Sequence, residues 1–260
     1  MDFLERILEA KRREVEERRT AVPEGEMRRR AADAPPPRDF RAALRAPNGI
    51  ALVAEVKRAS PSKGVLAADL DAAATARVYE RAGASAVSVL TDGPFFKGSL
   101  ADLAAARAAT SLPVLRKDFL VDRYQIEEAR AHGADAVLLI ARALGNGLFC
   151  ELLGLARELG MEALVEVHDE ADLERVAGTG YSVLGINSRD LATFETDLDT
   201  VRRLAELAPS EVLRVAESGI QTREDVLTLS LWGVDAILVG ESIVAAPDPA
   251  RRIAELLGRT

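Results

Sequence analysis

Several residues able to carry acid–base chemistry follow short apolar runs along this chain. They include three glutamates and two lysines, at Glu55, Lys57, Lys117, Glu166 and Glu217. A carboxylate can remove a proton, and an ammonium can donate one or attract an anion, so this set suits acid–base catalysis on an anionic substrate. Unpaired charges beside apolar segments are costly, which disfavours a purely structural role for the whole set. Glu55 alone could still be a structural ion-pair partner of Lys57 or Lys117.

Two further segments suit the binding of a phosphate group. The segments 218–220 (Ser-Gly-Ile) and 240–242 (Gly-Glu-Ser) each place a glycine where the backbone can approach a ligand closely. The second segment opens a short helix predicted over 242–246, whose first amides can face an anion. The segment 60–64, which begins with Ser60, adds hydroxyl and ammonium donors but lacks the spacing of a P-loop.

A resident metal or organic cofactor is not expected. The two histidines, His132 and His168, lie on different segments, and the sequence has neither a His-Glu-x-x-His motif nor a cysteine cluster. The segment 145–147 (Gly-Asn-Gly) is not a dinucleotide fingerprint, because Cys150 takes the place of the third glycine. We expect His132 to end a helix, His168 to anchor a loop and Cys150 to be buried in helix packing.

These residues must be positioned by a regular succession of strands and helices. From residue 50 onward, continuous apolar runs alternate with stretches of helical spacing, such as 70–82 and 99–110. Continuous apolar runs are typical of strands buried on both faces. Eight strand–helix units favour a closed α/β fold, the (β/α)8 TIM barrel, over an open doubly wound sheet. The predicted strands are 50–56, 86–90, 113–115, 136–140, 163–167, 183–186, 212–215 and 236–239.

We expect one barrel domain over 1–260, in which residues 1–48 form an N-terminal helical extension. Apolar residues at helical spacing predict an amphipathic helix over 2–19 that packs on the barrel. The prolines that follow predict an extended connector over 22–37, before a short helix at 40–45. The apolar residues of the first helix are Phe3, Leu4, Ile7, Leu8 and Val15.

Composition excludes several classes of function. The 260 residues carry a net charge of −8, which is unfavourable for a nucleic-acid surface. The apolar runs are too short to span a bilayer and the N-terminus is charged, so neither a membrane partner nor a secretory signal is expected. The single cysteine fits a reducing cytoplasm. An anionic substrate requires cations that gather locally, as Lys57, Lys117 and Arg189 do at the predicted carboxyl ends of the strands.

The polar segments at the predicted strand ends, taken together, resemble the indole-3-glycerol phosphate synthase family. The segments 54–64 and 185–191 are specific to that family, whereas the phosphate loops after the seventh and eighth strands occur in many barrel enzymes. The resemblance implies a (β/α)8 barrel and a cofactor-free reaction of tryptophan biosynthesis. In that reaction 1-(2-carboxyphenylamino)-1-deoxyribulose 5-phosphate undergoes ring closure with decarboxylation and dehydration. The segments are 54–64 (AEVKRASPSKG), 90–92 (LTD) with 95–99 (FFKGS), 115–119 (LRKDF), 165–167 (VEV), 185–191 (GINSRDL) and 216–220 (AESGI).

The resemblance also implies a role for each acid–base residue. Lys117 would be the acid that protonates the ketone oxygen during ring closure, and Glu166 would be the base of the dehydration. Glu55 would orient Lys117 and hold it charged. Lys57 would contact substrate anions and could serve as a second acid, and Glu217 would position the sugar hydroxyls and the catalytic network.

The remaining substrate contacts follow from the same resemblance. Asn187 and Arg189 match positions that bind polar groups of the substrate, and Phe119 would wall the aromatic ring unless it is ordinary core packing. Some family members carry a small residue in place of Glu241, so only its position is predicted. The other aromatic candidates are Phe95 and Phe96, and the phosphate grip would consist of Ser60, Ser218, Gly219, Gly240 and Glu241.

Two other functions remain compatible with the sequence. A related barrel enzyme, such as phosphoribosylanthranilate isomerase, would need an acid–base pair but no decarboxylation machinery. A non-catalytic barrel that binds a phosphorylated metabolite would tolerate the loss of Lys117 or Glu166. In each case the partner is a small phosphorylated molecule, not a nucleic acid or a membrane. The protein is expected in the cytoplasm as a monomer or weak homodimer.

Overall fold

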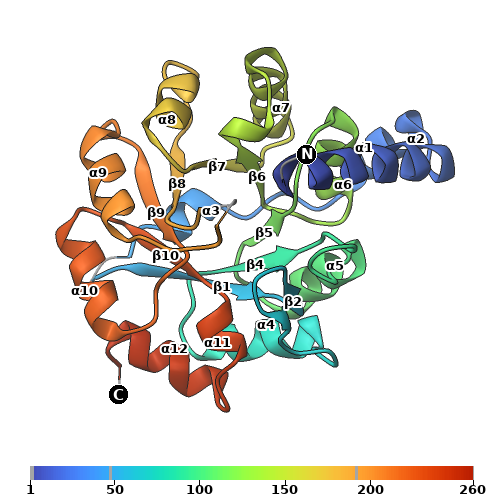
Figure 1. Ribbon diagram of the computed structural model, residues 1–260. Helices are drawn as coiled ribbons and strands as arrows, with labels where there is room; N and C mark the ends of the chain where they lie inside the picture. Colours follow the sequence, from blue (N-terminus) through green and yellow to red (C-terminus); the bar gives the residue numbers. More distant parts are fainter. Residues whose placement is uncertain (1–2, 47–48, 191–192, 260) are drawn as a thin grey trace.

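Eight parallel strands form a closed barrel at the centre of the molecule (Figure 1). The strands are β1 (Ala51–Val56), β4 (Ala86–Leu90), β5 (Val114–Lys117), β6 (Ala136–Ile140), β7 (Glu162–Val167), β8 (Val183–Asn187), β9 (Leu213–Glu217) and β10 (Ala236–Val239). The computed structural model describes residues 3–46, 49–190 and 193–259. Consecutive barrel strands pair with one another, and β1 closes the ring by pairing with both β4 and β10. The predicted (β/α)8 TIM barrel is confirmed.

Strand periodicity divides the side chains of the barrel into two layers. In β1, Ala51 and Val53 belong to the apolar cluster inside the barrel. Leu52 and Ala54 belong to the cluster between the strands and the helices. Because side chains alternate along a strand, the inward row of β1 continues at position 55. The last inward positions of the strands are therefore the places where polar side chains can point into the mouth of the barrel.

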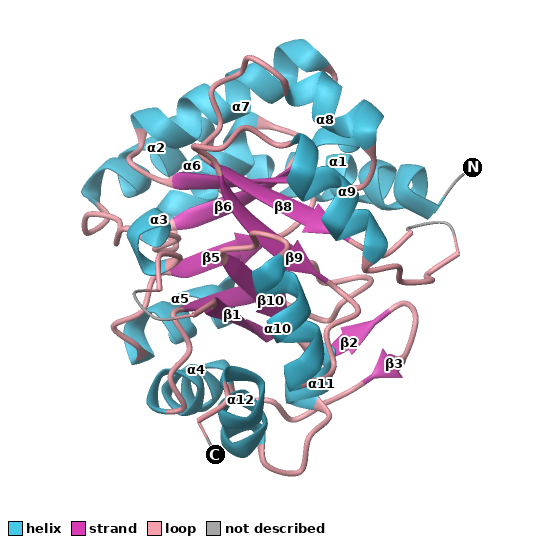
Figure 2. Ribbon diagram, turned by 90° about the vertical axis from the view of Figure 1, so that its left-hand side faces the viewer, coloured by secondary structure: helices cyan, strands magenta, loops and turns pink. Residues whose placement is uncertain are grey.

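Helices cover the outside of the barrel, and polar N-caps set where they begin (Figure 2). The helix predicted over 70–82 begins at Ala72, because the Asp71 side chain accepts hydrogen bonds from the next amides. The helix predicted over 99–110 begins after Ser99 for the same reason. The outer helices are α4 (Ala72–Arg81), α5 (Leu100–Ala109), α6 (Arg123–Ala131), α7 (Asn146–Glu158), α8 (Glu170–Val176), α9 (Asp199–Leu207), α10 (Arg223–Leu231) and α12 (Pro249–Leu257), with the short η1 (Ala141–Ala143) and α11 (Glu241–Val244).

The N-terminal extension is more helical than the sequence predicts. The predicted amphipathic helix is α1 (Phe3–Ala21), and the predicted short helix is α3 (Phe40–Ala43). The predicted extended connector over 22–37 is wrong in its middle part, which forms α2 (Glu24–Asp33). Pro23 precedes the first turn of α2, where no N–H is needed, and the next prolines follow its last turn. The prolines therefore bound a helix and do not prevent one.

The extension packs on two sides of the barrel. On the outside, Met27 of α2 packs with Val15 of α1 and Tyr124 of α6. At the amino ends of the strands, Phe40 and Leu44 join the inner apolar cluster, so the segment around α3 closes the barrel opposite the mouth. Residues 1–2 and 47–48 of the extension predicted over 1–48 lie outside the described residues.

Two local features differ from the expectation. The loop after β1 contains an antiparallel hairpin of β2 (Ala59–Ser60) and β3 (Gly64–Val65), which projects at one side in Figure 2. Cys150 is exposed on α7 and not buried, because Phe149 and Leu152 take the core-facing positions of that helix. His132 lies at the end of α6, as predicted. Within the described residues, no helix is both long and apolar enough to cross a membrane.

Candidate active site

The mouth of the barrel gathers the predicted acid–base residues, because they continue the inward rows of four strands. Glu55 follows Val53 on β1, Lys57 comes directly after that strand, and Lys117 follows the inward Leu115 of β5. By the same alternation, Glu166 ends the inward row of β7 and Glu217 that of β9. These side chains line one or both of two adjoining hollows in the mouth.

Two groups of ion pairs organise these charges. Lys57 Nζ lies 2.6 Å from Glu55 Oε1. Lys117 Nζ lies 3.4 Å from Glu166 Oε2 and 3.2 Å from Glu217 Oε2. Burial alone would lower the pKa of Lys117, but these two carboxylates and the charge of Glu55 raise it above its ordinary value. Lys117 is therefore an ammonium ion. The direct partner of Glu55 is Lys57, and Glu55 acts on Lys117 only through its charge.

The two carboxyl groups that share Lys117 differ in pKa. Burial raises the pKa of Glu217, Lys117 opposes the rise and Glu166 adds to it, which gives a value of about 8. Burial acts on Glu166 too, but Lys117, His168 and a hydrogen bond with Asn187 bring its pKa below the ordinary value. At neutral pH the site therefore holds one protonated and one ionised carboxyl group beside the same ammonium.

Two glycines provide the space for these carboxylates. Gly185 occupies an inward position on β8, and a Cβ atom there would collide with the Glu217 carboxylate. Gly240, which follows β10, gives the same space to the carboxylate of Glu55. Gly240 thus lies in the mouth, as the sequence predicts, and its lack of a side chain leaves space for the Glu55 carboxylate. The requirement for Gly185 is not visible in the sequence, because it depends on which side chain of the neighbouring strand fills the gap.

Asn187 ties together the ends of β8 and β9. Its Oδ1 accepts hydrogen bonds from Ser218 Oγ at 2.9 Å and from Arg189 N at 3.1 Å. Ser218 and Gly219 turn the chain through left-handed backbone, with φ of 68° and 73°, and both line the mouth. Asn187 therefore holds a tight loop on one side and, through its hydrogen bond to Glu166, an ionised carboxylate on the other.

Arg189 joins the loops that follow β1, β8 and β10. Its Nη2 lies 3.3 Å from both carboxylate oxygens of Glu241, and its Nη1 donates to Phe194 O at 3.3 Å. Ser62 of the β2–β3 hairpin approaches the same pair, 3.4 Å from Arg189 Nη1 and 3.5 Å from Glu241 Oε1. The Glu241 side chain, for which the sequence predicts only a position, thus forms an ion pair across the mouth. Leu191, which ends the family segment 185–191, lies outside the described residues.

The first hollow, called here the aromatic hollow, has apolar walls from the barrel and from α1. Phe119 and Phe96 form one wall, with ring centroids 6.2 Å apart. Phe95 does not line the hollow but packs edge-on against Phe3, at 5.9 Å between centroids. The sequence does not predict that α1 forms a wall of the site, because it shows that the helix has an apolar face but not which surface that face covers. Its residues are Phe3, Leu4 and Ile7.

The second hollow, called here the polar hollow, lies beside the loops after β9 and β10. It has a volume of about 660 Å³ and includes Ser218, Gly219, Gly240 and Lys63. The two hollows meet at the ion pairs of Lys57, Lys117 and Arg189. Apart from Phe95, every residue predicted for the site lines one of the two hollows. The cavity as a whole can therefore hold a molecule with one aromatic and one anionic end, its middle beside the acid–base groups.

His168 contacts the site more directly than expected. Its backbone N–H donates to Asp172 Oδ2 at 3.0 Å, which is the predicted anchoring of the loop after β7. Its ring Nε2 also lies 3.3 Å from Glu166 Oε1, and its Nδ1 lies 3.5 Å from Asp172 Oδ2. His168 thus supports the Glu166 carboxylate from behind. The sequence contains one indication of this contact: His168 follows Glu166 by two residues, so the two side chains lie on the same face of the strand end.

The sequence as a whole matches one enzyme family. The sequence pattern of "Indole-3-glycerol phosphate synthase" matches residues 4–256. An indole-3-glycerol phosphate synthase from Roseiflexus castenholzii is 55% identical over 265 residues, which cover 99% of this chain and 98% of that protein. An enzyme of the same name from Mycobacterium ulcerans is 51% identical, over 98% of this chain and 93% of that protein.

Solved structures agree on the fold. A structure of 3-hexulose-6-phosphate synthase from Salmonella typhimurium superposes with a TM-score of 0.63 and 17% identity, covering 81% of this chain and 100% of that one. A chain of the tryptophan synthase complex from Pyrococcus furiosus gives a TM-score of 0.59 at 17% identity, covering 80% and 97%. At this level of identity the comparison supports the barrel architecture alone.

Proposed function

The chain belongs to the indole-3-glycerol phosphate synthase family, and from this premise we propose how the residues of the mouth divide the reaction among them. The activity is that of a decarboxylating lyase of tryptophan biosynthesis. It closes the pyrrole ring of 1-(2-carboxyphenylamino)-1-deoxyribulose 5-phosphate with loss of carbon dioxide and water. Family membership decides against the isomerase and the non-catalytic barrel, the two alternatives compatible with the sequence.

The two hollows suggest how the substrate lies. The carboxyphenyl ring fits the aromatic hollow, against Phe119, and the phosphate fits the polar hollow, beside the loop of Ser218 and Gly219. Ser60, Gly240 and Glu241 complete the predicted grip. The ketone between the two ends then comes beside Lys117, where the hollows meet. The attack is intramolecular, so holding both ends of the substrate favours it by restricting the chain between them to the conformation in which the two carbons meet.

The observation that carries the proposal is that Lys117 Nζ lies between two buried carboxyl groups, 3.4 Å from Glu166 and 3.2 Å from Glu217, whose pKa values shift in opposite directions. In ring closure the ring carbon bearing the carboxylate attacks the ketone carbon, and Lys117 gives its proton to the ketone oxygen. The bond to the carboxylate then breaks, and its electron pair restores the aromatic ring as carbon dioxide leaves. Neither step needs a metal or an organic cofactor, because side chains supply the proton and stabilise the charge.

Dehydration requires a base and an acid. The ionised Glu166 removes a proton from the carbon beside the nitrogen. The hydroxyl leaves as water with a proton from an ammonium, for which Lys57 is the second candidate beside Lys117. Lys57 is already oriented by its 2.6 Å contact with Glu55. Asn187 keeps Glu166 in place and ionised through the hydrogen bond described above.

The remaining charged residues serve binding. Arg189 faces the junction of the hollows and is available to the substrate carboxylate once its ion pair with Glu241 opens. Glu217, protonated at neutral pH, donates to sugar hydroxyls without adding a negative charge near the phosphate. We further propose that the enzyme works in the cytoplasm, as a monomer or weak homodimer.

The test is turnover by the purified protein. With the substrate and no added metal or cofactor, we expect an indole product, followed by its fluorescence. Lys117→Ala should lose nearly all turnover while still binding inorganic phosphate. No indole product from the intact protein would contradict the proposed function, and an active Lys117→Ala variant would remove Lys117 from the role of acid.

A further inference from the structure

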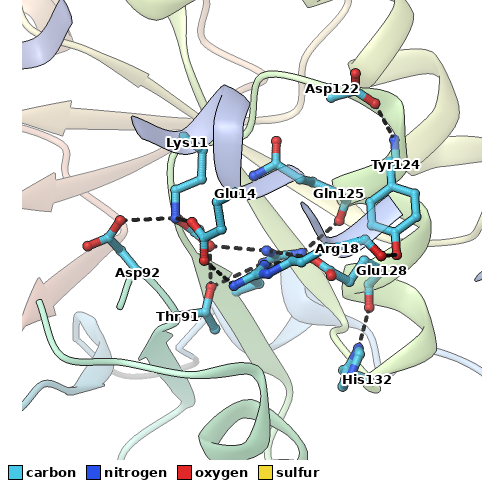
Figure 3. A network of polar contacts seen from close by, with 12 residues as sticks. Lys11, Glu14, Arg18, Thr91, Asp92, Asp122, Tyr124, Gln125, Glu128 and His132 are labelled. Atoms are coloured by element: carbon cyan, nitrogen blue, oxygen red, sulfur yellow. Dashed lines mark hydrogen bonds and ion pairs between the residues drawn. The ribbon is translucent and has the colours of Figure 1, made fainter. Parts of the chain in front are cut away.

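A second cluster of a lysine and carboxylates lies outside the barrel, between α1 and the ends of β4 and β5. Its centre is Lys11 of α1, whose side chain is only 1% exposed. Lys11 Nζ lies 2.6 Å from Glu14, 3.0 Å from Asp92 and 2.9 Å from Asp118. Figure 3 shows the ammonium pointing away from its helix, toward Asp92 and Glu14. A lysine this deeply buried is rare unless its charge is paired, and this one interrupts an otherwise apolar helix face.

Asp118 is fixed from two sides in this cluster. Its Oδ1 meets Lys11, and its Oδ2 lies 3.0 Å from Arg116 Nη2 and accepts a hydrogen bond from Thr91 Oγ1 at 2.6 Å. Burial alone would raise the pKa of Asp118, but Arg116 and Lys11, with the hydrogen bond from Thr91, lower it to about 2. Asp118 is therefore ionised and held at both oxygens.

Strand geometry connects this cluster to the acid of the mouth. Arg116 and Asp118 face outward from the end of β5, so Lys117 between them faces inward. The Arg116 side chain is itself fully buried, where it donates to Gln125 O at 2.8 Å. The backbone at position 117 is fixed too, because its carbonyl accepts from Thr91 N at 3.2 Å. With both sequence neighbours held on the outer side, the side chain of Lys117 has one direction left, into the barrel.

The carboxylates of the cluster also hold the wall of the aromatic hollow. Asp92 Oδ1 accepts hydrogen bonds from the amides of Phe95 and Phe96, at 2.8 and 3.2 Å. Asp118 Oδ1 accepts from Phe119 N at 2.9 Å. The same carboxylates that meet the buried ammonium of α1 therefore fix the turns from which this wall projects.

We propose that Lys11 is a positioning residue for the reaction. By holding Asp118 and Asp92 it sets the direction of Lys117 and the place of the aromatic wall, without touching the substrate. The proposal rests on the role of Lys117 proposed above. A merely structural ion pair would stabilise α1 and leave the chemical steps unchanged, so the chemistry must be measured apart from stability and from substrate affinity.

The experiment compares single turnovers of wild type and Lys11→Met, with enzyme in excess and at a temperature where both are folded. Methionine keeps an unbranched side chain, one atom shorter, and removes its charge. We expect the single-turnover rate at saturation to fall about 10- to 100-fold, the effect of a displacement of roughly 1 Å in a catalytic group. A higher KM with an unchanged saturated rate, or a lower Tm alone, would overturn the proposal.

Lys11→Met leaves buried carboxylates without their partner, which can prevent folding. The double variant Lys11→Met/Asp92→Asn restores the charge balance, and the amide oxygen introduced by Asp92→Asn can still accept from the two phenylalanine amides. We expect this variant to regain Tm but not the single-turnover rate, because Asp118 stays untied from α1. A rate that returned together with Tm would show that Lys11 serves stability only.

Arg19→Met is the matched control. Arg19 also joins α1 to the barrel, through Asp122 at 2.7 Å, but its ion pairs include neither Asp118 nor Asp92. It should lower Tm and leave the single-turnover rate unchanged; an equal loss of rate in Arg19→Met would contradict a specific role for Lys11. Failure of this inference is distinguishable from failure of the proposed function. In the first case Lys117→Ala is inactive and Lys11→Met is as fast as wild type, and in the second the wild-type protein itself makes no indole product.

Discussion

Two lysines of this protein, Lys117 in the mouth and Lys11 behind it, are each held between carboxylates, yet their surroundings differ in one decisive respect. Lys117 is the only cation within ion-pair distance of Glu166 and Glu217 in the described structure, apart from the His168 ring at Glu166. The second group, called here the outer cluster, consists of Lys11, Glu14, Asp92, Arg116 and Asp118. In it, Asp118 meets two cations, Lys11 and Arg116. The two carboxyl groups beside Lys117 therefore share one cation, whereas Asp118 alone has two.

This difference sets the protonation states. In the mouth, burial and a neighbouring carboxylate raise the pKa of Glu217 to about 8, so one proton is retained among these groups at neutral pH. In the outer cluster, the pKa of Asp118 is lowered to about 2, so no proton is exchanged there in the physiological range. The carboxyl groups that share the single cation Lys117 can therefore take part in proton transfer, whereas Asp118, which has two cations, stays ionised and serves as a fixed support.

The largest expected effect comes from removing the base of the mouth. Glu166→Gln should lower the rate of indole formation by about 10²- to 10⁴-fold, because a positioned general base contributes that much. Mass spectrometry of the quenched reaction should show the ring-closed, decarboxylated alcohol accumulating before dehydration. The control is Glu151→Gln, which changes a carboxylate of an exposed ion pair with Arg123 outside both clusters and should leave the rate within a few-fold. Wild-type activity in Glu166→Gln would place the base elsewhere.

The outer cluster should make the free energy of unfolding depend on pH in the acid range. The folded pKa of Asp118 is depressed to about 2 from an ordinary 3.8, so its contribution is present above pH 4 and is lost as the pH falls toward 2. Linkage makes this about 2 kcal/mol of unfolding free energy. Urea unfolding at pH 4, 3 and 2 measures the loss, and Asp118→Asn should show less of it while being less stable at pH 7. An identical pH dependence in the variant would contradict this assignment.

A smaller effect is expected from Glu217, and it depends on pH. Its raised pKa means that the neutral form exists below about pH 8 and that a negative charge appears above it. That charge would hold the proton of Lys117 more tightly and repel the substrate, so wild-type kcat/KM should fall as the pH rises through 8. Glu217→Gln has a neutral side chain at every pH. Its kcat/KM at pH 7 should be less than tenfold below that of wild type, and it should no longer fall as the pH rises through 8. If kcat/KM of the variant still falls above pH 8, another group causes the decrease.

The smallest expected effect concerns the ion pair of Arg189 and Glu241. Glu241→Gln frees Arg189 and removes a negative charge beside the anionic substrate, so KM should fall about two- to fivefold, the scale of a partly exposed ion pair. The gain should shrink in high salt, which screens the repulsion. An increase in KM would show instead that Glu241 holds Arg189 in its binding position.

The sequence predicted the barrel and the content of the mouth well, because both follow from local patterns. Continuous apolar runs mark buried strands, and alternation places Glu55, Lys117 and Glu166 on one side. The sequence does not predict the α2 helix, because prolines usually break helices, although Pro23 stands at a position that tolerates proline. Nor does it predict the role of Lys11, because the pattern of an amphipathic helix does not show which surface covers it; the only sign in the sequence is a lysine on the apolar face of α1.

Other features depend on contacts between distant segments and have no local signal. The pairing of Arg189 with Glu241 joins two loops that are 52 residues apart. The opposite pKa shifts of Glu166 and Glu217 arise from burial and from a shared cation, neither of which a strand pattern contains. The space that Gly185 leaves for Glu217 depends in the same way on the neighbouring strand.

The central claim, that Lys117 donates a proton while Lys11 only supports it, is tested most directly by chemical rescue. Small primary ammonium ions are added to Lys117→Ala, whose cavity opens to the mouth, and single-turnover rates are measured. The account predicts partial recovery that increases with the acidity of the ammonium ion, and no recovery of Lys11→Met, whose site is sealed. Failure of every ammonium ion to accelerate Lys117→Ala, or equal rescue of both variants, would contradict the account.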